Sequence, residues 1–214
     1  MQIRTKNILT IRFSADAEVN SFLNTIRDGE NPFSFKKILQ LSDDPKVNES
    51  RSDLLVYATI KHFGTDPRNY KPDGLAEMMK NYFHFYGWQV MSDSVEEPEA
   101  VKVDVDGEHY VHIEFNTKDH TPSPIMAALS FLFSKEMLYV KYASNDIAAY
   151  EDPLMLRKCG FYRCKAGHFT EGFGLRGYEA AEEACRMWGY TLSDYVSEGV
   201  VNGKYRVFWH KHKA

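Results

Sequence analysis

The chain has 214 residues, 43% of them hydrophobic and 14% aromatic, which is enough to bury the core of one domain with an appendage. Its net charge is −4, so the chain as a whole lacks the basic excess of a dedicated duplex-DNA binder. The charge is uneven, because residues 1–150 carry 22 acidic and 16 basic side chains whereas residues 151–214 carry 8 and 10. The C-terminal third is therefore chemically distinct.

Targeting and redox signals point to a cytoplasmic protein. No apolar run approaches the roughly 18 residues of a membrane span, and the N-terminal segment alternates like a strand instead of forming a signal-peptide core. The three cysteines, Cys159, Cys164 and Cys185, are an odd number without an export signal, so free thiols are expected.

The first third begins with one β-α unit. Residues 3–13 alternate as a strand, and apolar residues then recur at helical spacing over residues 15–28 until Gly29. Residues 33–39 are predicted to form a second strand. An insertion follows at about residues 48–100. Residues 54–63 fit either a strand, through their β-branched residues, or a helix capped by Ser50 or Ser52, and we prefer the helix; residues 75–86 should form another helix.

The middle of the chain predicts a strand, a helix and a further strand in unbroken succession. Residues 109–117 alternate, residues 123–134 form an apolar helix that starts at Pro124, and residues 136–143 alternate again. The strand at 109–117 pairs with residues 101–105, and a bulged loop with Gly107 in the left-handed conformation places Val101 and Val103 on its apolar face.

These elements give the order β-α-β-β-α-β, which predicts an α+β fold with a ferredoxin-like, four-stranded antiparallel sheet. Both helices should then cover the same face of the sheet. We expect residues 1–150 to form this domain, with its insertion, and residues 151–214 to form a C-terminal extension packed on the same core. The extension should comprise a strand, a helix and a terminal hairpin.

Several segments resemble the YubB-type ferredoxin-like family of phages, prophages and plasmids. They are ILTIRF, NPFSFKKILQL, IKHFGTDPRNY and IEFNTKDHTPSPIMAALSFLFSKEMLYVKYASND, within roughly residues 7–150, and the helix GYEAAEEACRMWGY. Two tryptophan-bearing family motifs are absent here, at residues 64–67 and 119–122. The resemblance implies an accessory protein of a mobile element in the host cytoplasm, with no assigned chemistry.

The candidate chemical groups are weak. Cys159, Cys164, His168 and Cys185 are ligands of the kind that zinc takes, but their spacing is not that of paired zinc knuckles, so we expect no metal and no cofactor. His109, His112, Glu114, Asp119 and His120 crowd one hairpin and its exit turn. A His112–Glu114 pair would suit a small hydrolase-like enzyme, which is one alternative.

Nucleic acid is the second alternative, because the C-terminal third interleaves basic and aromatic residues that could hold phosphates and stack on bases. The candidate single-strand-binding residues are Arg157, Lys158, Tyr162, Arg163, Lys204, Tyr205, Arg206, Trp209 and Lys211. The aromatic signature of an RNA-recognition motif is missing from the strands expected to carry it.

The preferred interpretation is a non-enzymatic accessory protein that binds a host or defence-system protein, with no membrane partner and with its oligomeric state open. It depends on the resemblance and on the lack of a usable active site. The loops expected to make this interaction carry Asp66, Arg68, Tyr70, Lys118, Asp119 and His120.

Overall fold

The computed structural model describes residues 2–38, 97–118, 121–152, 158–166, 168–202 and 204–210. The helices predicted at residues 54–63 and 75–86 lie outside these ranges. No helix among the described residues is long and apolar enough to cross a membrane.

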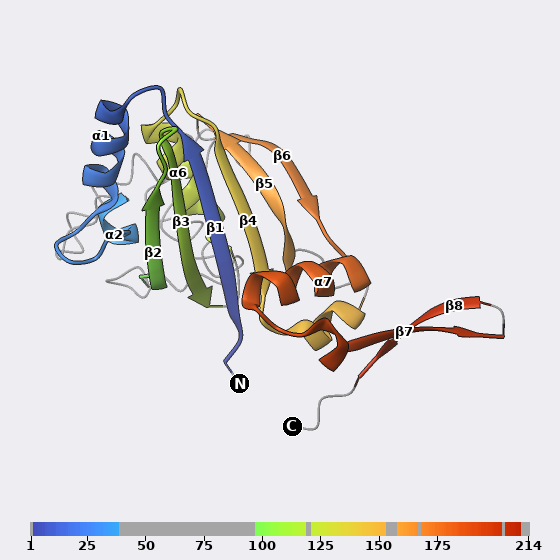
Figure 1. Cartoon of the computed structure of the whole chain (residues 1–214). Helices are drawn as coiled ribbons and strands as arrows, with labels where there is room; N and C mark the ends of the chain where they lie inside the picture. The colour runs from blue at the N-terminus through green and yellow to red at the C-terminus, as the bar shows by residue number, and fades with distance from the viewer. Residues whose placement is uncertain are drawn as a thin grey trace, which may run out of the picture.

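A six-stranded sheet organises the molecule (Figure 1), and every neighbouring pair of its strands is antiparallel. Its order is β2-β3-β1-β4-β5-β6. The strands are β1 (Arg4–Arg12), β2 (Glu99–Val105), β3 (Tyr110–Lys118), β4 (Leu138–Ser144), β5 (Cys159–Lys165) and β6 (His168–Gly174). The predicted α+β class is confirmed, although the sheet has two strands more than expected.

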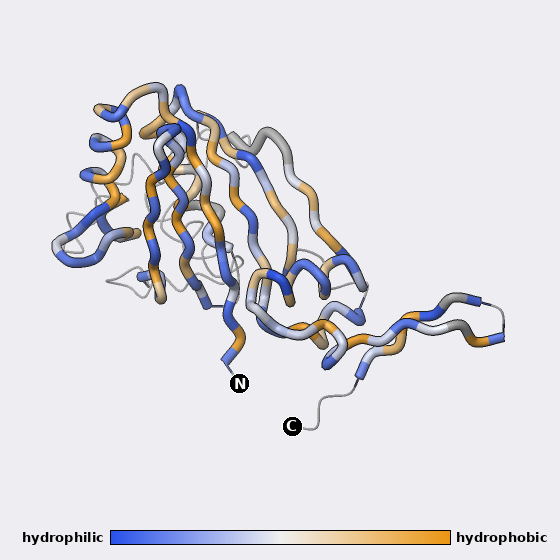
Figure 2. Tube along the Cα trace, viewed as in Figure 1, coloured by the Kyte–Doolittle hydropathy of each residue, from blue (hydrophilic) through white to orange (hydrophobic). Residues whose placement is uncertain are grey.

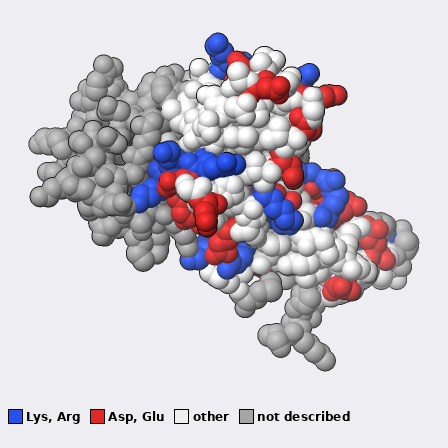
Figure 3. All heavy atoms as spheres, turned by 60° about the vertical axis from the view of Figure 1, so that its left-hand side comes forward, with Lys and Arg blue, Asp and Glu red and all other residues white. Residues whose placement is uncertain are grey.

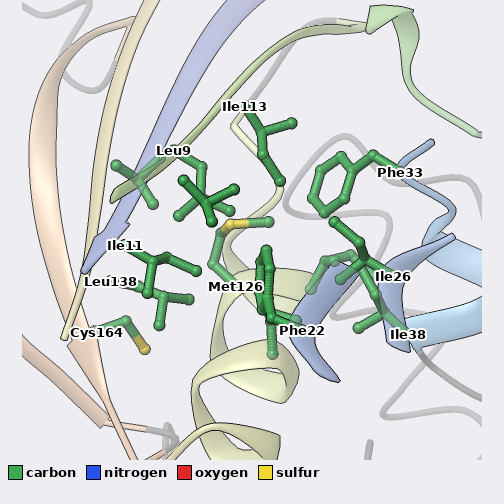
Figure 4. Packing of buried hydrophobic residues seen from close by; sticks show 14 of the residues in the cluster. Leu9, Ile11, Phe22, Ile26, Phe33, Ile38, Ile113, Met126, Leu138 and Cys164 are labelled. Atoms are coloured by element: carbon green, nitrogen blue, oxygen red, sulfur yellow. The ribbon is translucent and has the colours of Figure 1, made fainter. Parts of the chain in front are cut away.

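Two helices, α1 (Asp16–Ile26) and α6 (Ser123–Leu132), pack on the same face of this sheet, as predicted. Side chains of β1 and β3 alternate between buried and partly exposed, which appears in Figure 2 as alternating orange and blue. The buried set meets the two helices in one core (Figure 4), where the ring of Phe22 lies 5.0 Å from that of Phe133. Leu129 is fully buried in this core.

The strand predicted at residues 33–39 is wrong, because the segment forms the short helix α2 (Phe35–Ile38). Its start is fixed by the carboxylate of Glu97, which accepts the backbone N–H groups of Phe35 and Lys36, both at 2.8 Å. The same carboxylate accepts the Ser34 hydroxyl at 3.0 Å. The second strand in the chain is instead β2, which begins two residues after Glu97.

The β2–β3 hairpin has the predicted facing but a different turn. Val103 lies opposite Ile113, and Val105 lies opposite Val111. His109, not Gly107, is left-handed with φ 64°. The reason is the carboxylate of Asp106, which accepts the backbone N–H groups of Glu108 at 2.9 Å and Tyr110 at 3.0 Å and thereby sets the turn two residues later than expected.

The opposite face of the sheet is partly covered by α7 (Gly177–Trp188), which lies in front of the lower ends of the strands in Figure 1. Small residues let this helix approach closely: Ala180, Ala181 and Ala184 are fully buried in a second apolar cluster. This cluster also contains Tyr150 of η2 (Ile147–Glu151), whose hydroxyl accepts the Ser144 N–H at 3.0 Å and can donate to the Ser144 or Lys158 carbonyl, each at 3.1 Å.

The chain ends in a separate two-stranded ribbon, made of β7 (Val196–Val201) and β8 (Lys204–Trp209), which follows η3 (Leu192–Asp194). It projects away from the sheet in Figure 1. Its base is held by Val196, which is 3% exposed, and by the partly buried Val207 and Trp209. The predicted terminal hairpin is confirmed, with Val201 and Lys204 as the last pair before the turn.

Candidate functional site on the open sheet face

The candidate site is the part of the sheet that α7 leaves uncovered on the side opposite α1 and α6, here called the open face. Trp188 ends α7 over the sheet, where its indole N–H donates to the Ala143 carbonyl at 3.0 Å and its ring lies 5.2 Å from the Lys6 ammonium. Lys141 Nζ lies 2.5 Å from Glu183 Oε1 of the same helix. The helix therefore covers the row of strand residues through Lys6 and Ala143 and leaves the next rows open.

Three aromatic rings stand on neighbouring strands of the open face. Tyr139 on β4, Phe161 on β5 and Phe173 on β6 are 44%, 41% and 57% exposed. Phe161 lies directly opposite Phe173, and their rings stack with centroids 6.1 Å apart. Large apolar side chains on an uncovered sheet face need a reason, because a solvated face normally carries polar residues.

Cationic side chains lie among these rings. The Arg163 guanidinium lies 5.1 Å from the centre of the Tyr139 ring, and the two residues are directly opposed on β4 and β5. Further along the face, Arg12 lies 5.2 Å from the Tyr110 ring. Lys141 is the cross-strand partner of Phe161. Each exposed ring on β4 and β5 thus has a basic residue directly opposite it on the neighbouring strand.

The open face is also more basic than the chain as a whole. By strand register, the basic residues on this side are Arg4, Lys6, Arg12, Lys102, Lys118, Lys141, Arg163 and Lys165, and the acidic ones are Glu99, Asp104, Glu114 and Glu171. Three of these cations are paired with carboxylates, in Arg4–Glu99, Lys6–Glu114 and Lys141–Glu183. In the view of Figure 3, basic and acidic side chains are interspersed, so this side of the molecule does not present a large surface of one sign.

The predicted His–carboxylate pair does not form as expected. Glu114 lies 3.0 Å from the Lys6 ammonium, while His112 bonds to the Thr10 hydroxyl at 3.1 Å and lies 3.7 Å from Asp106. Backbone N–H donation by Tyr110 is the main cause that lowers the pKa of Asp106, and His112 contributes further. The His112 and Asp106 side chains are 44% and 47% exposed, so the described residues do not exclude water from a reacting bond between them.

The cysteines are divided between the two cores. Cys164 faces α6, where its sulfur lies 2.9 Å from the Ser130 hydroxyl, whereas Cys159 and Cys185 belong to the cluster under α7. Burial raises the pKa of Cys159 to about 12 and that of Cys164 to about 11. All three thiols are free, and the described residues contain no group of three or more potential metal ligands.

The residues predicted to bind nucleic acid are dispersed. Arg163 is on the open face, but Tyr162 points into the main core with 7% exposure, so its ring cannot stack on a base. Lys158 pairs with Asp146 at 3.3 Å. Lys204 and Arg206 share one face of the ribbon, and Tyr205 and Trp209 occupy positions on the other. Arg157 and Lys211 lie outside the described residues.

Of the residues predicted in the interaction loops, the structure describes Lys118. Lys118 ends β3 opposite Arg4. The other members, Asp66, Arg68, Tyr70, Asp119 and His120, lie outside the described residues. Tyr139 and Phe173 were not among the predicted site residues, whereas Phe161 belongs to the interleaved basic and aromatic residues of the C-terminal third. Their alternation with buried Val140 and Tyr162 was available as a signal, but the pairing of β4, β5 and β6 was not.

Comparisons with known proteins give no function. No family model and no curated protein matches the chain. A crystal structure of the protein api92 from Yersinia pseudotuberculosis, described by the family model DUF1281, is similar over 82% of this chain and 98% of that chain, with 10% identity and a TM-score of 0.37. A likeness at this level carries no conclusion about family or activity, so the resemblance to the YubB-type family stays a prediction.

Proposed function

We propose that this protein is a non-catalytic binding protein that holds single-stranded nucleic acid on the open face of its sheet. The observation that carries the proposal is the set of exposed rings on three neighbouring strands, Tyr139, Phe161 and Phe173, with Arg163 among them. An accessory role on a phage or other mobile element, in the host cytoplasm, is the part of the proposal that depends on the resemblance.

Stacking explains the rings and cations together. Unpaired bases can stack on aromatic side chains and on guanidinium planes, at about 1–3 kcal/mol per base, whereas a duplex hides these base faces. The cations between the rings are placed to meet the phosphates that connect successive bases. A protein partner would use the rings but would not require the local excess of Lys and Arg.

Fluorescence anisotropy with fluorescein-labelled 20-nucleotide DNA and RNA tests the proposal. In the Phe161→Ala/Phe173→Ala variant we expect binding to weaken at least tenfold, because about 1.4 kcal/mol changes an affinity tenfold. Arg163→Gln should weaken binding and reduce the salt slope by about one unit.

Two substitutions away from the open face serve as controls. Val105→Ala removes a 48% exposed apolar side chain from β2, and Arg27→Gln removes an exposed cation after α1. Both should bind like the unmodified protein. Absence of binding to either oligonucleotide at about 50 mM salt, where phosphate contacts are strongest, would refute the proposal and favour a protein ligand.

A further inference from the structure

The β7–β8 ribbon has one face that carries only positive charge. Lys204, Arg206 and Phe208 alternate along β8 on this face, here called the basic ribbon face, and His210 follows them. Their partners on β7 are uncharged: Val201 opposes Lys204, Gly199 opposes Arg206 and Ser197 opposes Phe208. Within β7 and β8 the acidic residue is Glu198, which pairs with Val207 on the other face.

An exposed ring sits in the middle of this charge. Phe208 is 41% exposed and lies over Gly199, where an added Cβ would come within 3.3 Å of the ring. His210 is tied to the Ser197 hydroxyl at 3.0 Å, and its backbone N–H donates to the Tyr195 carbonyl at 2.8 Å. The basic ribbon face is therefore anchored at its base and presents its cations outward, beyond the body of the protein.

We infer that the basic ribbon face binds duplex DNA next to the single strand held on the open face, so that the preferred ligand is DNA with a single-strand–duplex junction. This inference rests on the proposed function for the single-stranded part. A projecting two-stranded antiparallel ribbon has the width that the major groove of B-form DNA admits. The deep, narrow major groove of an RNA helix does not admit it.

The shapes of the two surfaces indicate which part of the DNA each of them binds. The open face has three exposed rings across neighbouring strands, which suits stacked, unpaired bases. The basic ribbon face has one ring between cations on a protruding element, so it can approach phosphates along a groove but offers no platform for successive bases.

Three labelled DNAs separate the two surfaces: a 20-nucleotide single strand, a 20-base-pair duplex and the same duplex with a 20-nucleotide overhang. The test variant is Lys204→Gln/Arg206→Gln, and the matched control is Arg27→Gln. We expect the test variant to bind duplex and junction DNA roughly ten- to a hundredfold more weakly near 0.1 M salt, with a salt slope about two units lower, and to bind the single strand normally.

The outcomes distinguish this inference from the proposed function. Equal binding of the junction by the test variant and the unmodified protein, or no detectable binding of duplex by the unmodified protein, would overturn the inference and leave single-strand binding intact. Loss of single-strand binding in the Lys204→Gln/Arg206→Gln variant would also overturn it, because the ribbon would then act on the single strand. If the unmodified protein binds duplex but no single strand, the proposed function fails instead, and the assignment of a junction fails with it.

Discussion

Replacing Glu97 by alanine should be among the most damaging changes to an acidic side chain in this protein. The carboxylate accepts two backbone N–H groups at the start of α2, those of Phe35 and Lys36, together with the side chains of Ser34 and Asn31. It also joins the end of the insertion to the first third of the chain. α2 in turn carries Phe35 and Ile38, both fully buried in the main core.

The expected loss is about 3 kcal/mol of unfolding free energy. Removing a helix-capping side chain costs about 0.5–2 kcal/mol, and hydrogen bonds to a charged group contribute about 1.5–3 kcal/mol each. The four bonds do not add, because the freed donors at this partly buried site regain some hydration. Glu97→Gln should cost about half as much, since the amide keeps one of the two acceptor oxygens.

Urea unfolding, monitored by circular dichroism, measures the loss. The midpoint temperature of thermal unfolding should fall by roughly 6–12 °C for a chain of this size. Glu108→Ala is the matched control, because this exposed side chain at the hairpin tip should change stability by less than about 0.5 kcal/mol. A Glu97→Ala variant whose urea midpoint equals that of Glu108→Ala would show that the carboxylate does not hold α2.

Three further changes test the cores. Leu129→Ala should cost about 2–5 kcal/mol in the same urea assay, and an unchanged midpoint would place Leu129 outside the core. Tyr150→Phe should cost about 0.5–1.5 kcal/mol because it removes the buried hydroxyl from Ser144, whose N–H keeps the Lys158 carbonyl at 2.8 Å; a smaller loss than in a Tyr139→Phe control would contradict this. Burial raises the pKa of Cys159 to about 12 in the folded state, whereas a thiol in the unfolded chain titrates near about 8.5. The stability that this difference contributes is fully present below about pH 8.5 and is lost as the pH rises toward 12. Cys159→Ala should therefore lose less stability than the unmodified protein between about pH 9 and 11, and parallel losses would refute this linkage.

The first and middle core strands and helices could be predicted from the sequence because local periodicity determines them. The alternation of Leu9 and Ile11 and the helical spacing of Phe22 and Ile26 each report a single buried face. The order of these strands and helices along the chain also predicted that α1 and α6 share one face of the sheet, since both helices follow strands that bury the same side.

The strand predicted at residues 33–39 shows where local pattern fails. Phe33, Phe35 and Ile38 are apolar enough for a short strand, but a distant carboxylate caps the segment as a helix. In the sequence, Glu97 belongs to an acidic run that looks like a solvated connection. Only the tertiary arrangement shows that the partly buried Glu97 carboxylate accepts hydrogen bonds from Asn31, Ser34, Phe35 and Lys36.

The open face illustrates a second limit. The predicted nucleic-acid-binding residues are basic and aromatic neighbours along the chain, such as Tyr162 with Arg163 and Tyr205 with Arg206. Alternation in a strand sends such neighbours to opposite faces, which is why Tyr162 is in the core while Arg163 is on the open face. The residues that share a surface are two apart along a strand or paired across strands.

The same rule makes the two proposed nucleic-acid surfaces independent of each other. Tyr139, Phe161 and Phe173 come together through the pairing of β4, β5 and β6, and Lys204 and Arg206 share a face because they are two residues apart on β8. Neither set contains a residue that packs in the main core, so charge and ring substitutions on them should leave folding nearly unchanged. A loss of binding in these variants can therefore be assigned to the substituted surface and not to unfolding. Comparing the losses for single-stranded and duplex DNA then shows which part of the DNA each surface binds.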